Sequence, residues 1–339
     1  MNLTEQKYHR FALVREMMET PSIIRSFSHS DLHGPLDSLR KTGKLFLTGE
    51  GSSRIFPAKH AIAFALRHGL LLCIHTEGSR QAEEIDLHGY TLFGASNSGK
   101  TKEVIALLRE SHAEDQFGLT AHQGTPLQEL CRETFILQCG KEAAVAATKS
   151  VIEQGLFYHS LLAQFANRPL TSTMLLEAGT TAERVLELPI DARLVERIAA
   201  SPVIYFAGRN NGVAEEASLK TNEITRKKSA YLEGTYAVHG IEEVMEPSEV
   251  VVVVEPFPEE EQKFKEVLAD GVGLTVIAVS SRQTIFPTIR IPSLPGFDAY
   301  LQLLACWNIL VETGIRLGID LDKPTRARKI GNEYVAPAK

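Results

Sequence analysis

The chain has 339 residues, of which 44% are hydrophobic and 23% are charged. This length exceeds a single ordinary core and predicts about two domains, while the composition excludes a disordered or fibrous chain. The formal net charge of -6 excludes a strongly basic surface for nucleic acid or an anionic membrane, so any bound phosphate must be held locally.

Residues 1–11 contain no apolar signal core, and the longest apolar runs, such as residues 250–254, are far shorter than a membrane span. Four cysteines are scattered without a CxxC pair: Cys73, Cys131, Cys139 and Cys306. We therefore expect no disulfide framework, no metal site and no cofactor, in a protein of the reducing cytoplasm that contacts neither membrane nor nucleic acid.

Apolar residues at helical spacing between Phe11 and Met18 predict a helix over residues 4–20 that ends at Thr20-Pro21. Short apolar segments then alternate with longer amphipathic ones. The predicted strands of this first series are residues 44–48, 70–74, 90–93, 116–119 and 134–137. The predicted helices among them are residues 54–68, 79–85, 100–110 and 126–132. Such alternation predicts a parallel sheet with helices on both faces.

A long helical region over residues 148–188, interrupted near Arg168-Pro169, leads to a second series of the same plan. Its predicted strands are residues 203–206, 250–254 and 274–279, and its predicted helices are residues 212–226 and 298–316. The pattern predicts an α/β fold of two doubly wound parallel-sheet domains, each a flavodoxin-like three-layer αβα sandwich. We place an N-terminal helical segment at residues 1–30, the first domain at 31–170, the second at 171–318 and a tail at 319–339. The tail is mostly polar, which by itself is typical of a frayed end.

The sharpest local pattern is the loop from Phe93 to Thr101, which follows an apolar strand and runs into a helix. Ser96, Ser98 and Thr101 bring three hydroxyls to this turn, and the helix N-terminus beyond it favours an anion. Helix capping by serine or threonine is the alternative, but capping explains one hydroxyl rather than three. We interpret the loop as a phosphate site rather than as a Walker or GxGxxG nucleotide loop.

Two further loops are rich in small residues. Residues 49–53 occupy the corresponding place after the first strand, and residues 140–149 precede the long helical region. Alone, the first indicates a tight strand-to-helix connection and the second an alanine-rich helix start. Beside the loop at 96–101, residues 49–53 would line the other wall of one pocket.

In the second half, Glu216, Lys220 and Glu223 share one face of a predicted helix. A surface ladder of ion pairs is the usual interpretation of such a trio. His239 follows in a Val-His-Gly turn, and a carboxylate and a histidine that converge on a sugar would suit proton transfer between adjacent carbons. The pattern alone leaves both interpretations open.

Six ordered motifs, spread over nearly the whole chain, resemble the family of proteins with two sugar-isomerase (SIS) domains, which includes the isomerase half of glucosamine-6-phosphate synthase. The resembling segments are residues 15–21, 49–53, 96–101, 140–149, 215–223 and 322–329. The resemblance implies two SIS domains and a small-molecule sugar phosphate as the partner. The motifs include nothing of that synthase's glutaminase half, so we expect no residues that generate ammonia.

The resemblance also implies roles for single residues in the first half. The sugar phosphate would be held by Ser53, Ser96, Asn97, Ser98 and Thr101. Val145 would meet the sugar through its backbone. Asn97 and Lys100 stand where the family has glutamine and glutamate, and Ala147 stands where it has serine. These changes surround the sugar, so they put the substrate in question more than the type of reaction.

For the second half and the tail, the resemblance implies a proton-transfer set. Glu223 would be the base that moves a proton between C1 and C2, and Lys220 would support it. His239 would reach in from the neighbouring subunit of a homodimer with shared active sites and help to open the ring. Lys329 would form a Schiff base with the open sugar, so that the tail becomes a lid rather than a frayed end.

The expected activity is that of a phosphosugar isomerase and deaminase, which converts the amino-hexose glucosamine 6-phosphate to fructose 6-phosphate and ammonia. A fructosamine-6-phosphate deglycase and a ketose-aldose phosphate isomerase are the alternatives. A non-catalytic sugar-phosphate sensor that regulates a partner is an alternative of another class. A sensor predicts loss of the catalytic set, whereas Glu223, His239 and Lys329 are all present.

Overall fold

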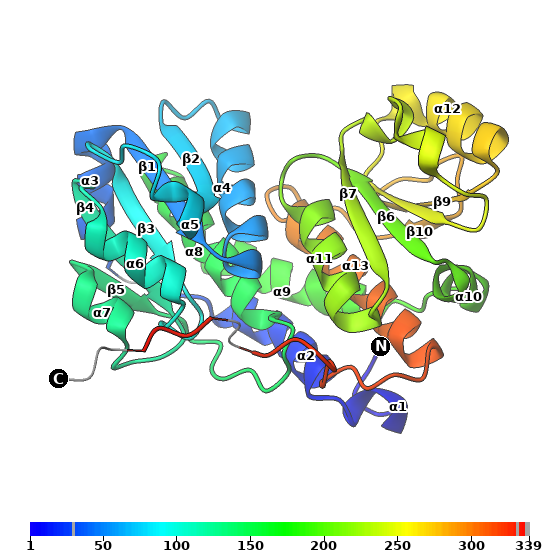
Figure 1. Cartoon of the computed structure of the whole chain (residues 1–339), viewed down its shortest axis with the longest axis horizontal. Coiled ribbons are helices and arrows are strands. Elements are labelled where there is room, and N and C mark those ends of the chain that lie inside the picture. Colours follow the sequence, from blue (N-terminus) through cyan, green and yellow to red (C-terminus); the bar gives the residue numbers. More distant parts are fainter. Residues whose placement is uncertain (29–30, 330–331, 336–339) are drawn as a thin grey trace. The chain divides into compact units, whose positions relative to one another are not determined.

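The computed structural model describes residues 1–28, 31–329 and 332–335. The last two residues of the predicted N-terminal segment, and residues 330–331 and 336–339 of the predicted tail, lie outside the described residues. Within the described part, the chain forms two five-stranded sheets whose paired strands are all parallel (Figure 1). The predicted α/β fold of two doubly wound sheets is confirmed.

The first sheet has the strand order β2-β1-β3-β4-β5. Its strands are β1 (Lys44–Gly49), β2 (Cys73–Gly78), β3 (Thr91–Ala95), β4 (Asp115–Thr120) and β5 (Glu133–Ile136). The chain goes from β1 out to β2 and then returns to the other side of β1 to form β3. In open parallel sheets, ligands bind at the carboxyl ends of the strands beside such a reversal. The loops after β1 and β3 therefore occupy the expected ligand position.

Helices cover both faces of this sheet, because successive side chains of a strand point to opposite sides. In β1, Leu45 and Leu47 enter one core and Phe46 enters the other. The first core is completed by helices α3 (His33–Thr42), α4 (Ile55–Arg67) and α8 (Lys149–Phe165). The second is completed by α5 (Ser79–Ala82), α6 (Lys102–Glu110) and α7 (Pro126–Leu130). Burial of both faces explains why β1 and β3 have mostly apolar sequences.

The second sheet has the order β10-β9-β8-β6-β7, which repeats the first when β6 is matched to β1 and β8 to β3. Its strands are β6 (Val203–Gly208), β7 (Lys228–Glu233), β8 (Val250–Val254), β9 (Thr275–Ser280) and β10 (Thr288–Arg290). The helical elements after β5 include α9 (Ser172–Leu186), α10 (Ala192–Ala200), α11 (Val213–Thr225), η2 (Tyr236–Val238), η3 (Ile241–Val244), η4 (Pro258–Glu260), α12 (Glu261–Phe264), η5 (Lys265–Val272) and α13 (Asp298–Arg316). The remaining elements are α1 (Gln6–His9), α2 (Ala12–Ser26) and η1 (Gly51–Ser53). The predicted duplication therefore holds strand for strand.

The chain divides into two compact units. Among the described residues, the unit of the first sheet contains those within 22–142, 147–176 and 328–335, and the unit of the second sheet contains residues 1–21, 143–146 and 177–327. The described tail residues from 328 to 335 thus belong to the unit of the first sheet. The boundaries at 30, 170 and 318 assume continuous segments and stay predictions. No helix in the described parts of the chain combines the length and the apolar character needed to cross a membrane.

The predicted first helix is wrong in its bounds. The chain forms α1 and α2 with a break at Arg10 and Phe11, and α2 continues through Pro21 to Ser26. A proline inside a helix removes one backbone hydrogen bond without forbidding the following turns. The helix continues because the next turn buries Ile24, which is 1% exposed.

The predicted strand over residues 70–74 is also displaced, and two strands were not predicted. β2 begins at Cys73, where it pairs with Lys44 at the start of β1. β7 and β10 were missed because they lie at the two edges of the second sheet, where part of each strand faces solvent. An edge strand needs no continuous apolar sequence, so its pattern is weak.

Candidate active site

The loop between β3 and α6 gathers three of the predicted phosphate-binding hydroxyls. Ser96 is 1% exposed, and its Oγ lies 2.8 Å from Thr101 Oγ1 and 3.5 Å from Ser98 Oγ. Gly99 permits this turn, because its φ is +65° and a Cβ there would lie 2.4 Å from Thr125 Oγ1. Thr101 is the N-cap of α6, so the hydroxyls lie where the helix dipole favours an anion.

The same loop has the GxxxxGK[ST] spacing from Gly94 to Thr101, so spacing alone does not exclude a Walker loop. In a Walker loop, backbone N–H groups cradle the phosphates. Here the N–H groups of Ser96 and Gly99 donate to backbone oxygens at 2.9 Å, and those of Lys100 and Thr101 donate to serine hydroxyls. The loop therefore presents mainly side-chain hydroxyls to an anion, which argues against a nucleotide loop.

Ser53 ends the short helix η1, which follows β1 directly. Gly49 of β1 pairs with Ala95 of β3 in parallel register. The loops that follow these strands therefore leave the sheet at the same edge. This places the half-buried Ser53 on the same edge as the hydroxyl cluster, and its contact with a phosphate stays a prediction.

A buried carboxylate, Glu142, joins Asn97 of this loop to the start of α8. Glu142 is 4% exposed, and its Oε1 accepts hydrogen bonds from Thr148 N at 2.8 Å and Ser150 N at 3.3 Å. Its Oε2 accepts hydrogen bonds from Ser150 Oγ at 2.8 Å and Asn97 Nδ2 at 3.2 Å. Our sequence reasoning assigned Glu142 no role. The available signal was an acidic residue in the loop that precedes α8, whose first N–H groups need acceptors.

The tail contacts this same region rather than fraying. Lys329 Nζ lies 3.3 Å from Glu142 Oε2, and 31% of the Lys329 side chain is exposed. Farther along, Glu333 pairs with Thr101 in an isolated antiparallel bridge, and its Oε1 lies 3.2 Å from Lys100 Nζ. Lys100, which departs from the family pattern, thus has an acidic partner in the tail.

Two opposing effects act on the pKa of Glu142. Burial raises the pKa of a carboxyl, because it penalises the charged form. The ammonium of Lys329 and hydrogen bonds from Thr148 and Ser150 outweigh burial and hold the pKa of Glu142 below its ordinary value. Glu142 is therefore ionised at neutral pH and attracts the tail lysine.

In the unit of the second sheet, α11 carries the predicted proton-transfer residues. The side chain of Lys220 is 0% exposed, and its Nζ lies 2.7 Å from Glu223 Oε2 and 3.4 Å from Glu216 Oε1. This burial excludes a surface ladder, because Glu216 is fully buried as well. The Glu223 side chain is 26% exposed, so it is the carboxylate of the two that a substrate can reach.

His239 and Val145 lie outside these contacts. His239 follows η2 and is exposed, and no hydrogen bond or ion pair within the described part of the chain joins it to Glu223. Its donation to a neighbouring subunit therefore stays a prediction. Val145 lies in a loop that α2 anchors, since Ala144 N donates to the buried Glu16 Oε2 at 3.3 Å. Its backbone contact with a sugar also stays a prediction.

The corresponding loop of the second sheet, after β8, has different chemistry. It begins with Glu255, whose φ is +48°. The Glu255 carboxylate accepts hydrogen bonds from Ser280 Oγ at 3.0 Å and Ser281 N at 2.9 Å. The guanidinium of Arg209 lies 4.1 Å from the centroid of the Phe257 ring and donates to the Glu255 carbonyl. The polar groups of this loop thus form hydrogen bonds with one another. The loop places a carboxylate at the position where the first sheet has hydroxyls.

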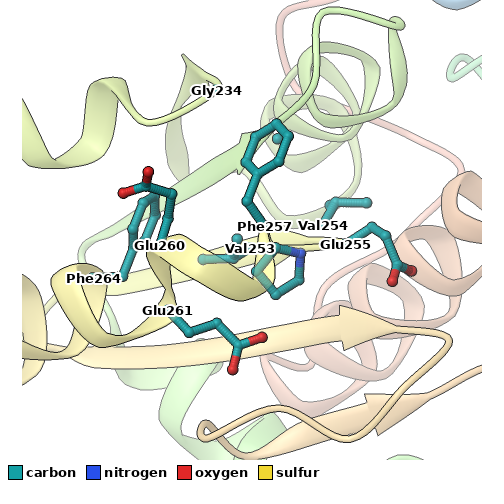
Figure 2. Close-up of a pocket in the computed structure, with 10 residues that line it drawn as sticks. Gly234, Val253, Val254, Glu255, Phe257, Glu260, Glu261 and Phe264 are labelled. Atoms are coloured by element: carbon teal, nitrogen blue, oxygen red, sulfur yellow. The ribbon is translucent and has the colours of Figure 1, made fainter.

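Glu255 and Phe257 also line a small cavity at this edge of the second sheet (Figure 2). Its volume is about 10 Å³, which is room for about one water molecule. Figure 2 shows the carboxylates of Glu255, Glu260 and Glu261 pointing in different directions, so they do not converge on one cation. This cavity therefore has neither the room nor the favourable charge that a phosphate needs.

Solved structures share the fold over almost the whole chain. The chain matches the Escherichia coli tagatose-6-phosphate ketose/aldose isomerase with a TM-score of 0.77 and 20% identity, covering 96% of this chain and 100% of that one. It matches the C-terminal domain of the Francisella tularensis glucosamine-fructose-6-phosphate aminotransferase with a TM-score of 0.77 and 18% identity, covering 95% and 100%. The Thermotoga maritima glucosamine-6-phosphate deaminase gives a TM-score of 0.72 and 18% identity, covering 96% and 99%. The fold is that of a double-SIS protein.

Sequence similarity points the same way, although no protein-family model matches the chain. The Aeropyrum pernix isomerizing glutamine–fructose-6-phosphate aminotransferase is 28% identical over 263 residues, which is 69% of this chain and 42% of the relative. The Mycolicibacterium paratuberculosis protein of the same name is 25% identical over 334 residues, which is 86% of this chain and 51% of the relative. The chain thus spans about half the length of these curated relatives. The chain is therefore related in sequence to these aminotransferases, and it shares its fold with the phosphosugar isomerase structures.

Proposed function

We propose that the chain is an isomerase and deaminase of an amino-hexose 6-phosphate, converting glucosamine 6-phosphate and water to fructose 6-phosphate and ammonia. The observation that carries the proposal is the pairing of Glu223 with the buried Lys220 at 2.7 Å. Burial of an ammonium is unfavourable without compensating carboxylates, so the protein maintains this pair against a free-energy cost. Relatives that act on glucosamine 6-phosphate and tagatose 6-phosphate share the fold, which supports the proposed substrate class.

In the proposed reaction, Glu223 removes the proton from C2 of the open sugar and returns it to C1. The aldehyde at C1 becomes a hydroxymethyl group, and the amine at C2 becomes an imine. The amine of Lys329 then replaces ammonia on C2, and water hydrolyses the lysine imine to the ketone of fructose 6-phosphate. One water enters and one ammonia leaves, so the atoms balance. Lys220 orients the Glu223 carboxylate through their contact at 2.7 Å.

The phosphate is proposed to bind the hydroxyls of the loop after β3. Ser96 Oγ lies 2.8 Å from Thr101 Oγ1 and 3.5 Å from Ser98 Oγ, and α6 begins directly after Thr101. Ser53 and Asn97 complete the proposed set. A helix N-terminus with clustered hydroxyls binds phosphate dianions without a net positive charge on the protein.

Ketose-aldose isomerisation is the second candidate, and the match to the tagatose-6-phosphate isomerase favours it. A panel of glucosamine 6-phosphate, fructosamine 6-phosphates and ketose 6-phosphates separates the candidates. Ammonia together with fructose 6-phosphate supports the deaminase, a released amino acid supports the deglycase, and interconversion without amine release supports the isomerase. Tight binding of a sugar phosphate without turnover would contradict an enzyme and favour a sensor.

We also propose that the active form is a homodimer with shared sites. Tyr236 and Val244, on either side of His239, are large apolar side chains that are exposed. Apolar groups around an exposed histidine suit an interface with a second copy of the chain, which would carry His239 into the partner's site. Sedimentation that shows a fully active monomer would contradict this proposal.

A further inference from the structure

Two separate attachments fix the tail within the unit of the first sheet. At one end, Lys329 Nζ contacts Glu142 Oε2 at 3.3 Å. At the other end, the backbone of the tail pairs with the start of α6: Lys102 N donates to Asn332 O at 3.1 Å, and Tyr334 N donates to Lys100 O at 2.8 Å. The second attachment combines this backbone pairing with side-chain contacts, Lys100 with Glu333 at 3.2 Å and Asn332 Nδ2 with Glu103 Oε1 at 2.7 Å. The first depends on one carboxylate.

That carboxylate serves the phosphate loop, the start of α8 and the tail at once. Its Oε2 accepts from Lys329 at 3.3 Å and from Asn97 Nδ2 at 3.2 Å, so the tail lysine and a residue of the phosphate loop share one oxygen atom. The hydrogen bonds from the first turn of α8 hold the same carboxylate in place. A buried carboxylate with several donors has little freedom to move, so it defines the position of the ammonium.

We propose that Glu142 is a positioning residue that holds the tail lysine, Lys329, beside the phosphate loop. This inference rests on the proposed function for its consequence, because Lys329 then stands ready to react with the open sugar. Glu142 touches no reacting atom in this proposal. It acts on the reaction through Lys329.

The test uses the full-length protein with Glu142→Gln. The amide keeps an acceptor oxygen for the N–H groups of α8 but presents an NH2 group, or a neutral oxygen, to Lys329. Glu153→Gln is the matched control. Glu153 is also a buried carboxylate of this unit and accepts hydrogen bonds from Gln138 N at 2.7 Å and Cys139 N at 2.6 Å, without contact to the tail in these bonds.

The readout is the rate of trypsin cleavage after Arg328 and Lys329, measured without substrate at a temperature where circular dichroism shows each variant folded. Loss of a charge-assisted hydrogen bond is expected to raise the rate in Glu142→Gln by about tenfold over the wild type. Glu153→Gln should cleave at the wild-type rate. Equal rates in the wild type and Glu142→Gln, or equal acceleration in both variants, would overturn the proposal.

A second variant covers the case in which Glu142→Gln does not fold. Lys329→Met breaks the same contact from the tail and leaves the buried carboxylate in place. Cleavage after Arg328 should then rise by a similar factor, and the Glu142→Gln, Lys329→Met double variant, if folded, should cleave no faster than either single one. Additive acceleration, or an unchanged rate in Lys329→Met, would contradict the pairing.

Turnover measurements then separate this inference from the proposed function. In an active enzyme, Glu142→Gln should lower kcat by about tenfold while the Kd of inorganic phosphate stays within about twofold, which a merely structural defect would not achieve. If no phosphosugar is turned over but the cleavage results hold, the proposed function fails and the positioning role stands. If turnover is found but Glu142→Gln does not change the cleavage rate, the proposed function stands and the positioning role of Glu142 fails.

Discussion

The two sheets share one strand order but differ in one loop, which follows β3 in the first sheet and β8 in the second. In the first sheet, Ser96 N donates to Leu119 O at 2.9 Å, and in the second, Glu255 N donates to Val279 O at 2.8 Å. Both loops therefore leave their sheets through the same backbone contact. After it, the first loop offers hydroxyls at the start of a helix, and the second places the Glu255 carboxylate on neighbouring serines.

The topology of the sheet therefore determines where a ligand can bind, whereas the residues of the loop determine which ligand binds there. A carboxylate at such an edge repels a phosphate, whereas hydroxyls at a helix N-terminus attract it. The duplication therefore does not by itself predict two phosphate sites. We expect one in the chain, at the loop after β3, and a structural role for the loop after β8.

The largest expected effect separates two carboxylates of the second unit. Glu223→Gln keeps the shape of the side chain but removes the proposed base, so kcat should fall by about 10²- to 10⁴-fold. Binding of inorganic phosphate should be unchanged. Glu255→Gln, at the edge without a phosphate site, should leave kcat unchanged. Steady-state kinetics of folded variants measure both, and wild-type turnover by Glu223→Gln would end the enzymatic proposal.

The next effect distinguishes the units by their response to acid. His60 and His159 are buried in the first unit, with their rings 5.5 Å apart and Phe64 4.6 Å from His159. Burial lowers the pKa of His159 to about 4, and it also lowers the pKa of His60 well below its ordinary value. In the second unit, His9 and His239 are exposed.

Because the folded pKa of His159 lies below the unfolded value of about 6.5, the unfolded chain binds more protons between these values. The free energy of unfolding is therefore highest above pH 6.5, where His159 is neutral in both states. As the pH falls toward 4, this free energy decreases by about 3 kcal/mol on account of His159. Hydrogen exchange should show the first unit losing protection before the second on acidification. His159→Phe should make this loss smaller, and earlier opening of the second unit would contradict the prediction.

A smaller effect concerns the turn of the phosphate loop. Gly99 has a positive φ, and a Cβ there would lie 2.4 to 2.7 Å from Thr125 side-chain atoms, whereas Gly124, with a φ of +66°, has nothing within 4 Å of its Cβ position. Gly99→Ala should therefore lower the free energy of unfolding by about 2 kcal/mol or more, and Gly124→Ala by about 1 kcal/mol. Urea denaturation compares the two. Equal losses would show that the loop adjusts without strain.

The smallest predicted effect compares a serine hydroxyl of the loop after β3 with one beside the loop after β8. Ser96→Ala removes the hydroxyl that contacts both Ser98 and Thr101. The Kd of inorganic phosphate should rise by about tenfold, the effect of one hydrogen bond to a charged group. Ser280→Ala, which removes a donor to Glu255 in the second sheet, should leave the Kd unchanged. Calorimetric titration measures both, and an unaffected Ser96→Ala would place the phosphate elsewhere.

Most of the fold was predictable because strands buried on both faces have apolar sequences. β8, with five consecutive valines, is an example. Edge strands such as β7 and β10 were not predictable, since their partly exposed residues lack this pattern. The position of Pro21 misled the prediction of α2, because burial of the following turn outweighed the local preference.

The contacts of the candidate site also fall into those that the sequence predicts and those that it does not. Ser96, Ser98 and Thr101 are neighbours in sequence, and Lys220 and Glu223 are three positions apart on a helix, so the local backbone determines their proximity. The sequence by itself therefore determined these two groups. The contact between Glu142 and Lys329 spans 187 residues, and the complete burial of Lys220 depends on its surroundings. Only the tertiary structure decided these features, because burial and long-range pairing depend on which distant elements pack together.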